Sequence, residues 1–311
     1  MKYVLCIDGG GVRCLTALSF LKRLEEHLRK LNNSSIYDQF DCYAGTSAGS
    51  LIVAVVTYTE ISINDALNGP FNYSNITKLF EQSFKNKIFN GYFYPLYSSV
   101  GKTNIINSVL GDKKLSDTTK DALFIAYDIL NDTPCFFKSY DRLNRAKKDS
   151  SIANIVDASS SATTYFAPVS VNGIPMMDGG ICANNPTDCL YADLIKMYPN
   201  EELRVLSIGL TKYSFKDYPI GTLQKWGKIQ WILKGDLVSR FTAVDTSIVD
   251  YRMNAITRAM NHKYLRIIPE EIDNIPIDAR DRDSYNKLID IGTQMFDDNI
   301  SLINEFFNCQ T

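Results

Sequence analysis

The chain has 311 residues, of which 45% are hydrophobic and 22% charged, and its formal net charge is -2. This length allows one large domain or two ordinary ones, and this composition is that of a globular protein rather than a disordered or fibrous one. The charge gives no indication of a nucleic-acid partner. No apolar run approaches the roughly 20 residues that a membrane-spanning helix needs, so any membrane contact is expected to be adsorption of the folded surface.

The cysteines and the amino terminus indicate a compartment. The seven cysteines are an odd number, and no two of them have the C-x-x-C spacing of a zinc or redox site. We interpret them as reduced and mostly buried. Residues 1–7 lack the apolar stretch of a secretory signal. The sequence therefore predicts a cytoplasmic protein that is free or peripherally attached to membranes.

The first predicted elements are a strand and a helix. Residues 3–7 are a short apolar run that ends at Asp8-Gly9-Gly10-Gly11, the pattern of a buried parallel strand leaving its sheet at a turn. Leucines then recur at helical spacing between residues 18 and 31, with charged residues on the other face. Thr16 is the predicted amino-terminal cap of this helix.

The same alternation continues along the chain. Residues 40–44 predict a strand, and residues 50–58, which follow a tight turn, predict a buried helix. Three further segments predict strands, at 123–129, 175–177 and 204–208. Two predict helices between them, at 152–159 and 187–197. The pattern predicts an α/β fold of three layers, with a mainly parallel central sheet flanked by helices.

The carboxy-terminal part is less regular. Residues 210–245 are rich in Lys, Gly and Trp with weak periodicity, and we expect surface loop and helix there. An apolar helical stripe over about 284–307 predicts a final helix packed on the sheet. Because no repeat or low-complexity linker interrupts the chain, we expect a single domain over 1–311, with its motifs within about 1–268.

The pentapeptide Gly45-Thr46-Ser47-Ala48-Gly49 matches G-x-S-x-G. In this motif the serine lies on a strained strand-to-helix turn, and the flanking glycines let the backbone fold sharply. The following helix adds unpaired N–H groups and a positive dipole end. The pentapeptide also occurs by chance in other proteins, but the predicted strand before it and helix after it favour Ser47 as a nucleophile, with Gly45 and Gly49 shaping the turn.

The glycine loop after the first strand has three open interpretations. The bare amides of Gly9, Gly10 and Gly11 suit an oxyanion hole, to which Arg13 adds charge or support. The same placement suits a dinucleotide pyrophosphate, but Cys14 occupies the position of the third glycine in that fingerprint. The third interpretation is an ordinary tight turn.

Asp178-Gly179-Gly180 follows another short apolar run. An aspartate at the end of a strand, with Gly179 and Gly180 beside it, can approach a neighbouring turn closely and accept a proton. In isolation this tripeptide is more often an ordinary turn. Asp178 is therefore a candidate base whose role depends on where the fold places it.

The shortage of histidines limits the possible mechanisms. His27 and His262 are the two histidines of the chain. His27 lies among charged residues of the first predicted helix and is interpreted as a surface residue. Ser47, Asp178 and His262 follow the chain order of an α/β-hydrolase triad. Alternatively, His262 is a loop residue in a polar turn.

Four blocks in order resemble the patatin-like phospholipase family: residues 6–13, 45–49, 158–168 and 178–186. Residues 205–209 and 264–267 also resemble its later segments, so the similarity covers about residues 1–268. The resemblance implies a Ser47–Asp178 catalytic dyad, an oxyanion hole formed by the Gly-Gly-Gly-x-Arg loop, and no metal or cofactor. Cys14 departs from the family, which usually has glycine at this position.

The resemblance implies a lipid acyl hydrolase of the phospholipase A, lysophospholipase or galactolipase type. Its substrate would be a phospholipid or other acyl lipid at a membrane or micelle surface, with no nucleotide or nucleic-acid partner. Two alternatives remain: a catalytically impaired lipid-binding protein of the same fold, and an esterase with the Ser47–Asp178–His262 triad. A short-chain ester assay on variants of these residues separates the three.

Two segments are candidates for contact with lipid. One is aromatic and the other basic, and each has the alternative interpretation of a buried cluster or a solvated loop. They consist of Phe89, Tyr92, Phe93, Tyr94, Pro95, Leu96 and Tyr97, and of Lys138, Arg142, Arg145, Lys147 and Lys148. Gly101-Lys102-Thr103 resembles the end of a phosphate-binding loop, but Leu96 stands where that motif needs glycine, so no nucleotide site is expected.

Overall fold

The computed structural model describes residues 1–82, 93–141, 143, 147, 149–212, 215–233, 237–270, 272 and 275–308. Their strands form one sheet with the order β5-β6-β3-β2-β1-β7-β8, and β4 pairs with β3 outside this path. The strands are β1 (Lys2–Ile7), β2 (Cys42–Thr46), β3 (Asp121–Asp128), β4 (Thr133–Lys138), β5 (Val169–Val171), β6 (Ile174–Asp178), β7 (Leu203–Ile208) and β8 (Lys263–Ile267).

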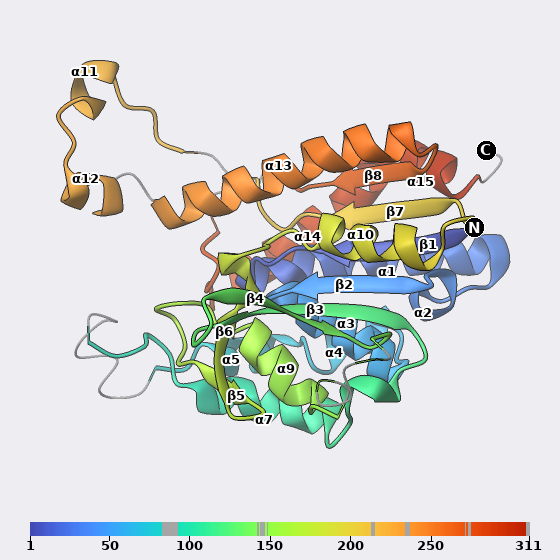
Figure 1. Cartoon of the computed structure of the whole chain (residues 1–311), viewed down its shortest axis with the longest axis horizontal. Helices are drawn as coiled ribbons and strands as arrows, with labels where there is room; N and C mark the ends of the chain where they lie inside the picture. The colour runs from blue at the N-terminus through green and yellow to red at the C-terminus, as the bar shows by residue number, and fades with distance from the viewer. Residues whose placement is uncertain are drawn as a thin grey trace.

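The helices cover both faces of this sheet (Figure 1). The helices of the described residues are α1 (Cys14–Asn32), α2 (Ile36–Gln39), α3 (Ala48–Thr59), α4 (Ile63–Asn68), α5 (Tyr73–Leu79), α7 (Ser99–Leu110), α9 (Ile152–Ser159), α10 (Thr187–Met197), α11 (Ile220–Leu223), α12 (Lys228–Leu233), α13 (Leu237–Ala259), α14 (Arg282–Asp298) and α15 (Ile300–Phe307). Of these, α11 and α12 project away from the sheet (Figure 1). Short 3-10 turns lie at Gly11–Arg13, Leu115–Asp117 and Gly179–Ile181.

The central strand β1 shows why three layers form. Leu5 and Ile7 belong to a core shared with α1, α3 and α14, whereas Val4 and Cys6 belong to a second core shared with α10 and α13. Successive side chains of a strand point to opposite faces, and a strand that is apolar on both faces needs helices on both. The predicted three-layer α/β fold is therefore confirmed.

The sheet is parallel in its middle and antiparallel at one side. β1 pairs in parallel with β2 and β7, β2 with β3, and β7 with β8. β3 pairs antiparallel with both β4 and β6, and β5 pairs antiparallel with β6. The sequence did not predict β4, β5 and β8 as strands. The antiparallel side brings the end of β6 toward the end of β2.

Several predicted boundaries need correction. Thr16 is not a cap: the 3-10 turn at Gly11–Arg13 leads directly into α1, and the Thr16 hydroxyl donates to the Arg13 carbonyl at 2.8 Å within the first turn. The predicted final helix is two helices, α14 and α15, which meet at Asn299. The segment 210–245, expected to be loop and helix, contains α11, α12 and the beginning of α13, a helix of 23 residues that continues to Ala259.

The cysteines of the described residues form no disulfide. Cys6, Cys14, Cys42 and Cys135 are buried, and Cys182 and Cys189 are partly buried, as the sequence predicted; Cys309 lies outside the described residues. Within the same described ranges, no helix combines the length and the apolar character needed to cross a membrane.

Candidate active site

Ser47 lies on the sharp turn that the G-x-S-x-G motif predicts. It joins the last residue of β2 to the first residue of α3 with φ 52° and ψ -124°, a strained conformation for a residue with a side chain. A Cβ on Gly45 would lie 2.5 Å from the Gly49 carbonyl oxygen, and one on Gly49 would lie 2.6 Å from the Asp8 carbonyl oxygen. Both positions therefore require glycine.

Asp178 reaches Ser47 because β2 and β6 share one edge of β3. Thr46 of β2 pairs with Ile125, and Asp178 of β6 pairs with the next residue, Ala126. The other edge of β3 is occupied by β4. The register thus brings the last residue of β6 beside the turn after β2, and the Ser47 hydroxyl donates to Asp178 Oδ2 at 2.6 Å.

The surroundings of Asp178 make it a stronger base than an ordinary carboxylate. Its side chain is 5% exposed, and burial raises its pKa to about 6 because the charged form loses its hydration. The Ser47 hydroxyl, the Gly180 amide at 2.7 Å and the Lys102 charge act in the opposite direction. Gly179 has no room for a side chain, since a Cβ there would overlap the Ile125 carbonyl.

The glycine loop after β1 lies against this pair. A Cβ on Gly9 would lie 3.0 Å from Ser47 Cβ, and the Gly9 amide donates to the Asn184 carbonyl at 3.1 Å. Gly9 therefore fixes the loop, and its amide is not free. The amides of Gly10 and Gly11 donate to no acceptor among the described residues, and Gly11 adopts φ +60°. Two of the three predicted amides thus remain available for an oxyanion.

Arg13 holds the loop in place. Its Nε donates to the Ile275 carbonyl at 2.9 Å and its Nη1 to the Thr211 hydroxyl at 3.1 Å, with 8% of the residue exposed. Of the two roles considered for Arg13, charge or support, these contacts fit support. The neighbouring Cys14 is buried, which raises the pKa of its thiol to about 12, so this thiol stays protonated at neutral pH.

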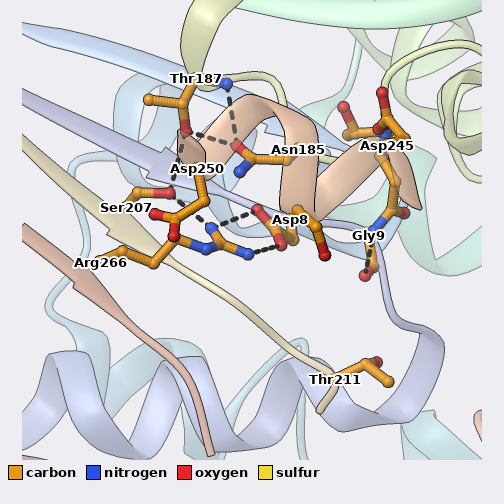
Figure 2. A network of polar contacts seen from close by, with 12 residues as sticks. Asp8, Gly9, Asn185, Thr187, Ser207, Thr211, Asp245, Asp250 and Arg266 are labelled. Carbon is orange, nitrogen blue, oxygen red and sulfur yellow. Dashed lines mark hydrogen bonds and ion pairs between the residues drawn. The ribbon is translucent and has the colours of Figure 1, made fainter. Parts of the chain in front are cut away.

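A buried polar network that the sequence analysis missed holds Asp8, the residue before the glycine loop (Figure 2). The Arg266 guanidinium of β8 donates to both carboxylate oxygens of Asp8, at 3.0 and 2.5 Å, and to the Ser207 hydroxyl at 2.6 Å. The Ser207 hydroxyl is 2.9 Å from that of Thr187. The only available signals were an aspartate before the glycines and an arginine in the last strand, which are 258 positions apart.

A second support comes from α13. Asp245 Oδ2 accepts the Asn184 amide at 3.0 Å, and the Asn184 side-chain amide donates to the Gly9 carbonyl at 3.4 Å. Burial raises the pKa of the Asp245 carboxyl. Asp245 thus links α13 to the glycine loop through Asn184. The weak periodicity of this segment gave no signal for it.

Lys102 contacts the turn that is hydrogen-bonded to both Ser47 and Asp178. Its ammonium lies 2.9 Å from an Asp157 carboxylate oxygen and 2.8 Å from the Ser161 hydroxyl. In the same turn, the Ser159 hydroxyl accepts the Ser47 amide at 3.1 Å, and the Ser161 carbonyl accepts the Asp178 amide at 3.1 Å. Sequence reasoning considered Lys102 only as part of a phosphate loop, and its actual partners lie more than 50 positions away.

Ser47 and Asp178 open into a cavity of about 820 Å³, within the range of about 300–1,000 Å³ typical of ligand pockets. One wall carries the glycine loop, Ser47, Asp178 and Lys102. Apolar side chains from α3, α4–α5 and the 160–166 segment line much of the rest, among them Leu51, Phe71, Ile76, Leu79, Phe80 and Phe166. The cavity therefore offers a polar reacting end and an apolar compartment.

The structure does not bring His262 to this site. Ser47 follows the carboxyl end of β2, whereas His262 precedes β8, a strand of the same parallel set. The two residues thus lie at opposite ends of the parallel strands, and His262 Nδ1 is 2.8 Å from the Tyr191 hydroxyl. The Ser47–Asp178–His262 triad is therefore absent. His27 is bonded to Asn304 at 2.8 Å. In the described part of the chain, no three His, Cys, Asp or Glu side chains are grouped to hold a metal ion.

The described residues of the two candidate lipid-contact segments include both buried and exposed side chains. Tyr97 is buried against Phe80 and Phe166, whereas Phe93 and Tyr94 are exposed. Lys138 pairs with Asp193 at 2.7 Å. Phe89, Tyr92, Arg142, Arg145 and Lys148 lie outside the described residues.

Comparison with known proteins agrees with the motifs. The family model of the patatin-like phospholipases matches residues 5–191. The chain is 27% identical to patatin-like protein 2 of Arabidopsis thaliana, over 98% of this chain and 85% of the relative, and 25% identical to patatin group D-2 of Solanum tuberosum, over 95% and 84%. VipD from Legionella pneumophila aligns with a TM-score of 0.47 at 13% identity, covering 96% of this chain and 67% of its own. The match over more than half of the chain shows that this protein belongs to the patatin-like phospholipase family.

Proposed function

We propose that the protein is a lipid acyl hydrolase that cleaves fatty-acyl esters with a Ser47–Asp178 dyad. Family membership supports lipid acyl hydrolysis in general. The observation that carries the specific proposal is the 2.6 Å hydrogen bond from Ser47 to Asp178 at the polar end of a largely apolar cavity. A hydroxyl is a poor nucleophile unless a positioned base removes its proton, and no histidine of the chain lies at this place.

In the first step, Asp178 accepts the Ser47 proton as Oγ attacks the ester carbonyl. The carbonyl electrons move to oxygen, and the free amides of Gly10 and Gly11 donate to the resulting oxyanion. The intermediate collapses when the bond to the leaving alcohol breaks, and the protonated Asp178 returns its proton to that alcohol. The products of this step are the acyl-enzyme on Ser47 and the deacylated lipid.

In the second step, water replaces the alcohol. Asp178 accepts a proton from the water as its oxygen attacks the acyl carbonyl, and the same two amides stabilise the oxyanion. Collapse returns the proton to Ser47 and releases the fatty acid. A base with a pKa of about 6 is ionised at neutral pH and still accepts a proton more readily than an ordinary carboxylate.

The cavity supports an acyl chain as the part of the substrate that is bound. Its apolar walls from α3 and from the α4–α5 region can cover a hydrocarbon chain, while Lys102 and the glycine loop stay at the polar end. Burial of apolar area gives about 25 cal/mol per Å². Phospholipids, galactolipids and lysolipids share this acyl ester, so all three are candidate substrates, consistent with a protein that acts at the surface of a membrane or micelle.

The test is hydrolysis of a soluble nitrophenyl ester by wild type, Ser47→Ala, Asp178→Asn and His262→Ala. We expect kcat to fall by about 10³-fold or more in the first two variants and to stay unchanged in the third. Full activity in Asp178→Asn would refute the dyad. Wild type without activity on soluble ester, micelles and vesicles would favour a lipid-binding protein that has lost turnover.

A further inference from the structure

A segment projects from the end of the molecule where the parallel strands terminate and the cavity opens. Residues 215–233, which include α11 and α12 and are called the arm here, extend from the end of the molecule at which the strands point their carboxyl ends (Figure 1). The arm begins at the cavity, because Phe215 lines it together with Phe241 of α13. The Arg240 guanidinium lies 4.2 Å from the Phe215 ring, which links the arm to α13.

The charge of the arm is opposite to that of the whole chain. Residues 215–233 have three lysines and one aspartate, a net charge of +2, whereas the chain carries -2. The lysines are Lys216, Lys225 and Lys228, and all three are exposed, as is Lys212 just before the arm. A cluster of exposed lysines attracts a surface that carries anionic head groups, at about 1 kcal/mol per lysine.

The arm also holds both tryptophans of the chain. The Trp226 ring centroid is 5.1 Å from that of Trp231 and 4.7 Å from that of Tyr218. All three residues stay partly exposed, so these rings pack on one another at the surface rather than in the sheet's core. Trp and Tyr favour the boundary between lipid head groups and acyl chains, because their rings have an apolar body and a polar group.

The exposed face of α13 continues this surface. Phe241, Val244, Ile248 and Tyr251 recur at helical spacing along one face, and Phe241 and Tyr251 are 70% and 75% exposed. Such contiguous apolar exposure on a soluble chain marks an interaction site. Because Phe241 also lines the cavity, this face leads from the arm to the mouth of the active site.

We propose that the arm and the exposed face of α13 bind the surface of an anionic lipid bilayer and hold the cavity mouth against it. The lysines would meet the anionic head groups, and the tryptophans, Tyr218 and the α13 side chains would enter the interfacial region. The purpose of this binding rests on the proposed function, since a lipid hydrolase must reach substrate in a bilayer. The binding itself needs no turnover and can be measured alone.

The arm provides its own probe, because the intrinsic tryptophan emission of the chain comes entirely from Trp226 and Trp231. Ser47→Ala protein, which leaves lipid intact, is titrated with phosphatidylcholine vesicles with or without phosphatidylglycerol. We expect a blue shift and co-sedimentation with the anionic vesicles, both weakened by salt. In Lys225→Glu/Lys228→Glu, binding should fall by about tenfold or more, and Trp226→Ala/Trp231→Ala should lose co-sedimentation.

The matched control is Lys30→Glu/Leu31→Ala. Both residues are exposed at the carboxyl end of α1, at the end of the sheet opposite to the arm (Figure 1). The control should bind vesicles like its parent. Absence of binding to vesicles of either composition, or equal binding by the arm variants, would overturn the proposal. So would a blue shift that grows with protein concentration without vesicles, since a second copy of the chain would then cover the arm.

A soluble nitrophenyl ester separates this proposal from the catalytic one. On a Ser47 background, the arm variants should hydrolyse the soluble ester like wild type and lose hydrolysis of anionic vesicles. Vesicle binding without any ester hydrolysis would refute the dyad and leave the binding surface intact. Equal hydrolysis of vesicles by wild type and the arm variants would refute the surface and leave the dyad intact.

Discussion

The Lys102 ammonium lies 2.9 Å from an Asp157 carboxylate oxygen, with both side chains at least 94% buried. The turn that they hold supplies Ser159, which accepts the Ser47 amide, and Ser161, which accepts the Asp178 amide. Lys102 also lowers the pKa of Asp178 by its charge, against the larger effect of burial. One buried cation thus affects both the position of the Ser47–Asp178 pair and the pKa of Asp178.

The first prediction concerns the pH dependence of hydrolysis. The base must be a carboxylate, so kcat/KM of wild type should rise with pH and reach half its maximum near the Asp178 pKa of about 6. A nearby positive charge favours the carboxylate, and Lys102→Met removes it. The Asp178 pKa should then rise, and the acid limb of the profile should move to higher pH. The measurement is kcat/KM for a soluble ester across pH 4 to 9.

Loss of Lys102 alone leaves the Asp157 charge buried without a partner, which can cost about 3–5 kcal/mol of stability. The double variant Lys102→Met/Asp157→Asn removes both charges and serves where the single variant does not fold. A lower kcat with an unmoved acid limb in both variants would mean that Lys102 acts only on geometry.

The second prediction concerns stability. Burial raises the folded-state pKa of Asp178 from 3.8 to about 6. The protonated carboxyl therefore contributes to the stability of the folded state, fully below pH 3.8, and this contribution is lost as pH rises through about 6. The amide of Asp178→Asn cannot ionise, so the variant does not lose this stability as pH rises. The variant should therefore be inactive but more stable than wild type at pH 8, by about 2–3 kcal/mol. The gain should vanish at pH 4 in urea denaturation.

Asp281 gives a control with the opposite sign. It caps α14, and hydrogen bonds from Ser284 lower its pKa. Its contribution is present at neutral pH and is lost as pH falls through the lowered pKa, so Asp281→Ala should destabilise the protein at pH 8 and less so in acid. An Asp178→Asn variant that is equally or less stable than wild type at pH 8 would contradict the burial argument.

The sequence predicted the parts of the site but not the way in which they meet. Gly45, Ser47 and Gly49 belong to a local strand-turn-helix pattern, which periodicity and turn chemistry reveal. The approach of Asp178 depends on its pairing with Ala126 in an antiparallel register, and strand order is not encoded locally. Here the family resemblance, rather than periodicity, linked positions 47 and 178.

The supports of the site were missed for the same reason. Arg266, Asp245 and Lys102 each act through a partner distant in sequence, namely Asp8, Asn184 and Asp157. A buried charge has no periodic signature, because it is recognised only by the partner that compensates it. The arm was noticed for its lysines and tryptophans, but its position at the cavity mouth depends on the fold.

The third prediction concerns the ion pair behind the glycine loop. Arg266→Met leaves the Asp8 carboxylate, 2% exposed, without its partner, and should cost about 3–5 kcal/mol of stability. Because Asp8 precedes the loop, kcat on soluble ester should fall as well. The control is Arg252→Met. Arg252 forms a solvent-exposed ion pair with Asp188 at 3.5 Å, which should contribute less than about 1 kcal/mol to stability. Equal losses in the two variants, measured by urea denaturation, would argue against a special role for the Asp8–Arg266 pair.

The last prediction tests the packing of the nucleophile turn on β1. A Cβ on Gly49 would lie 2.6 Å from the Asp8 carbonyl oxygen, and backbone cannot give way as a flexible side chain can. Gly49→Ala should therefore push α3 away from the glycine loop, lower the free energy of unfolding by about 2–3 kcal/mol, and reduce kcat by disturbing Ser47. Gly221→Ala in α11 meets nothing within 4 Å and should be neutral, or stabilising by about 0.5–1 kcal/mol. Urea denaturation and ester hydrolysis of both variants provide the comparison. A fully active and stable Gly49→Ala would show that the turn and the loop need not be in close contact, and would remove the geometric basis for donation by Gly10 and Gly11.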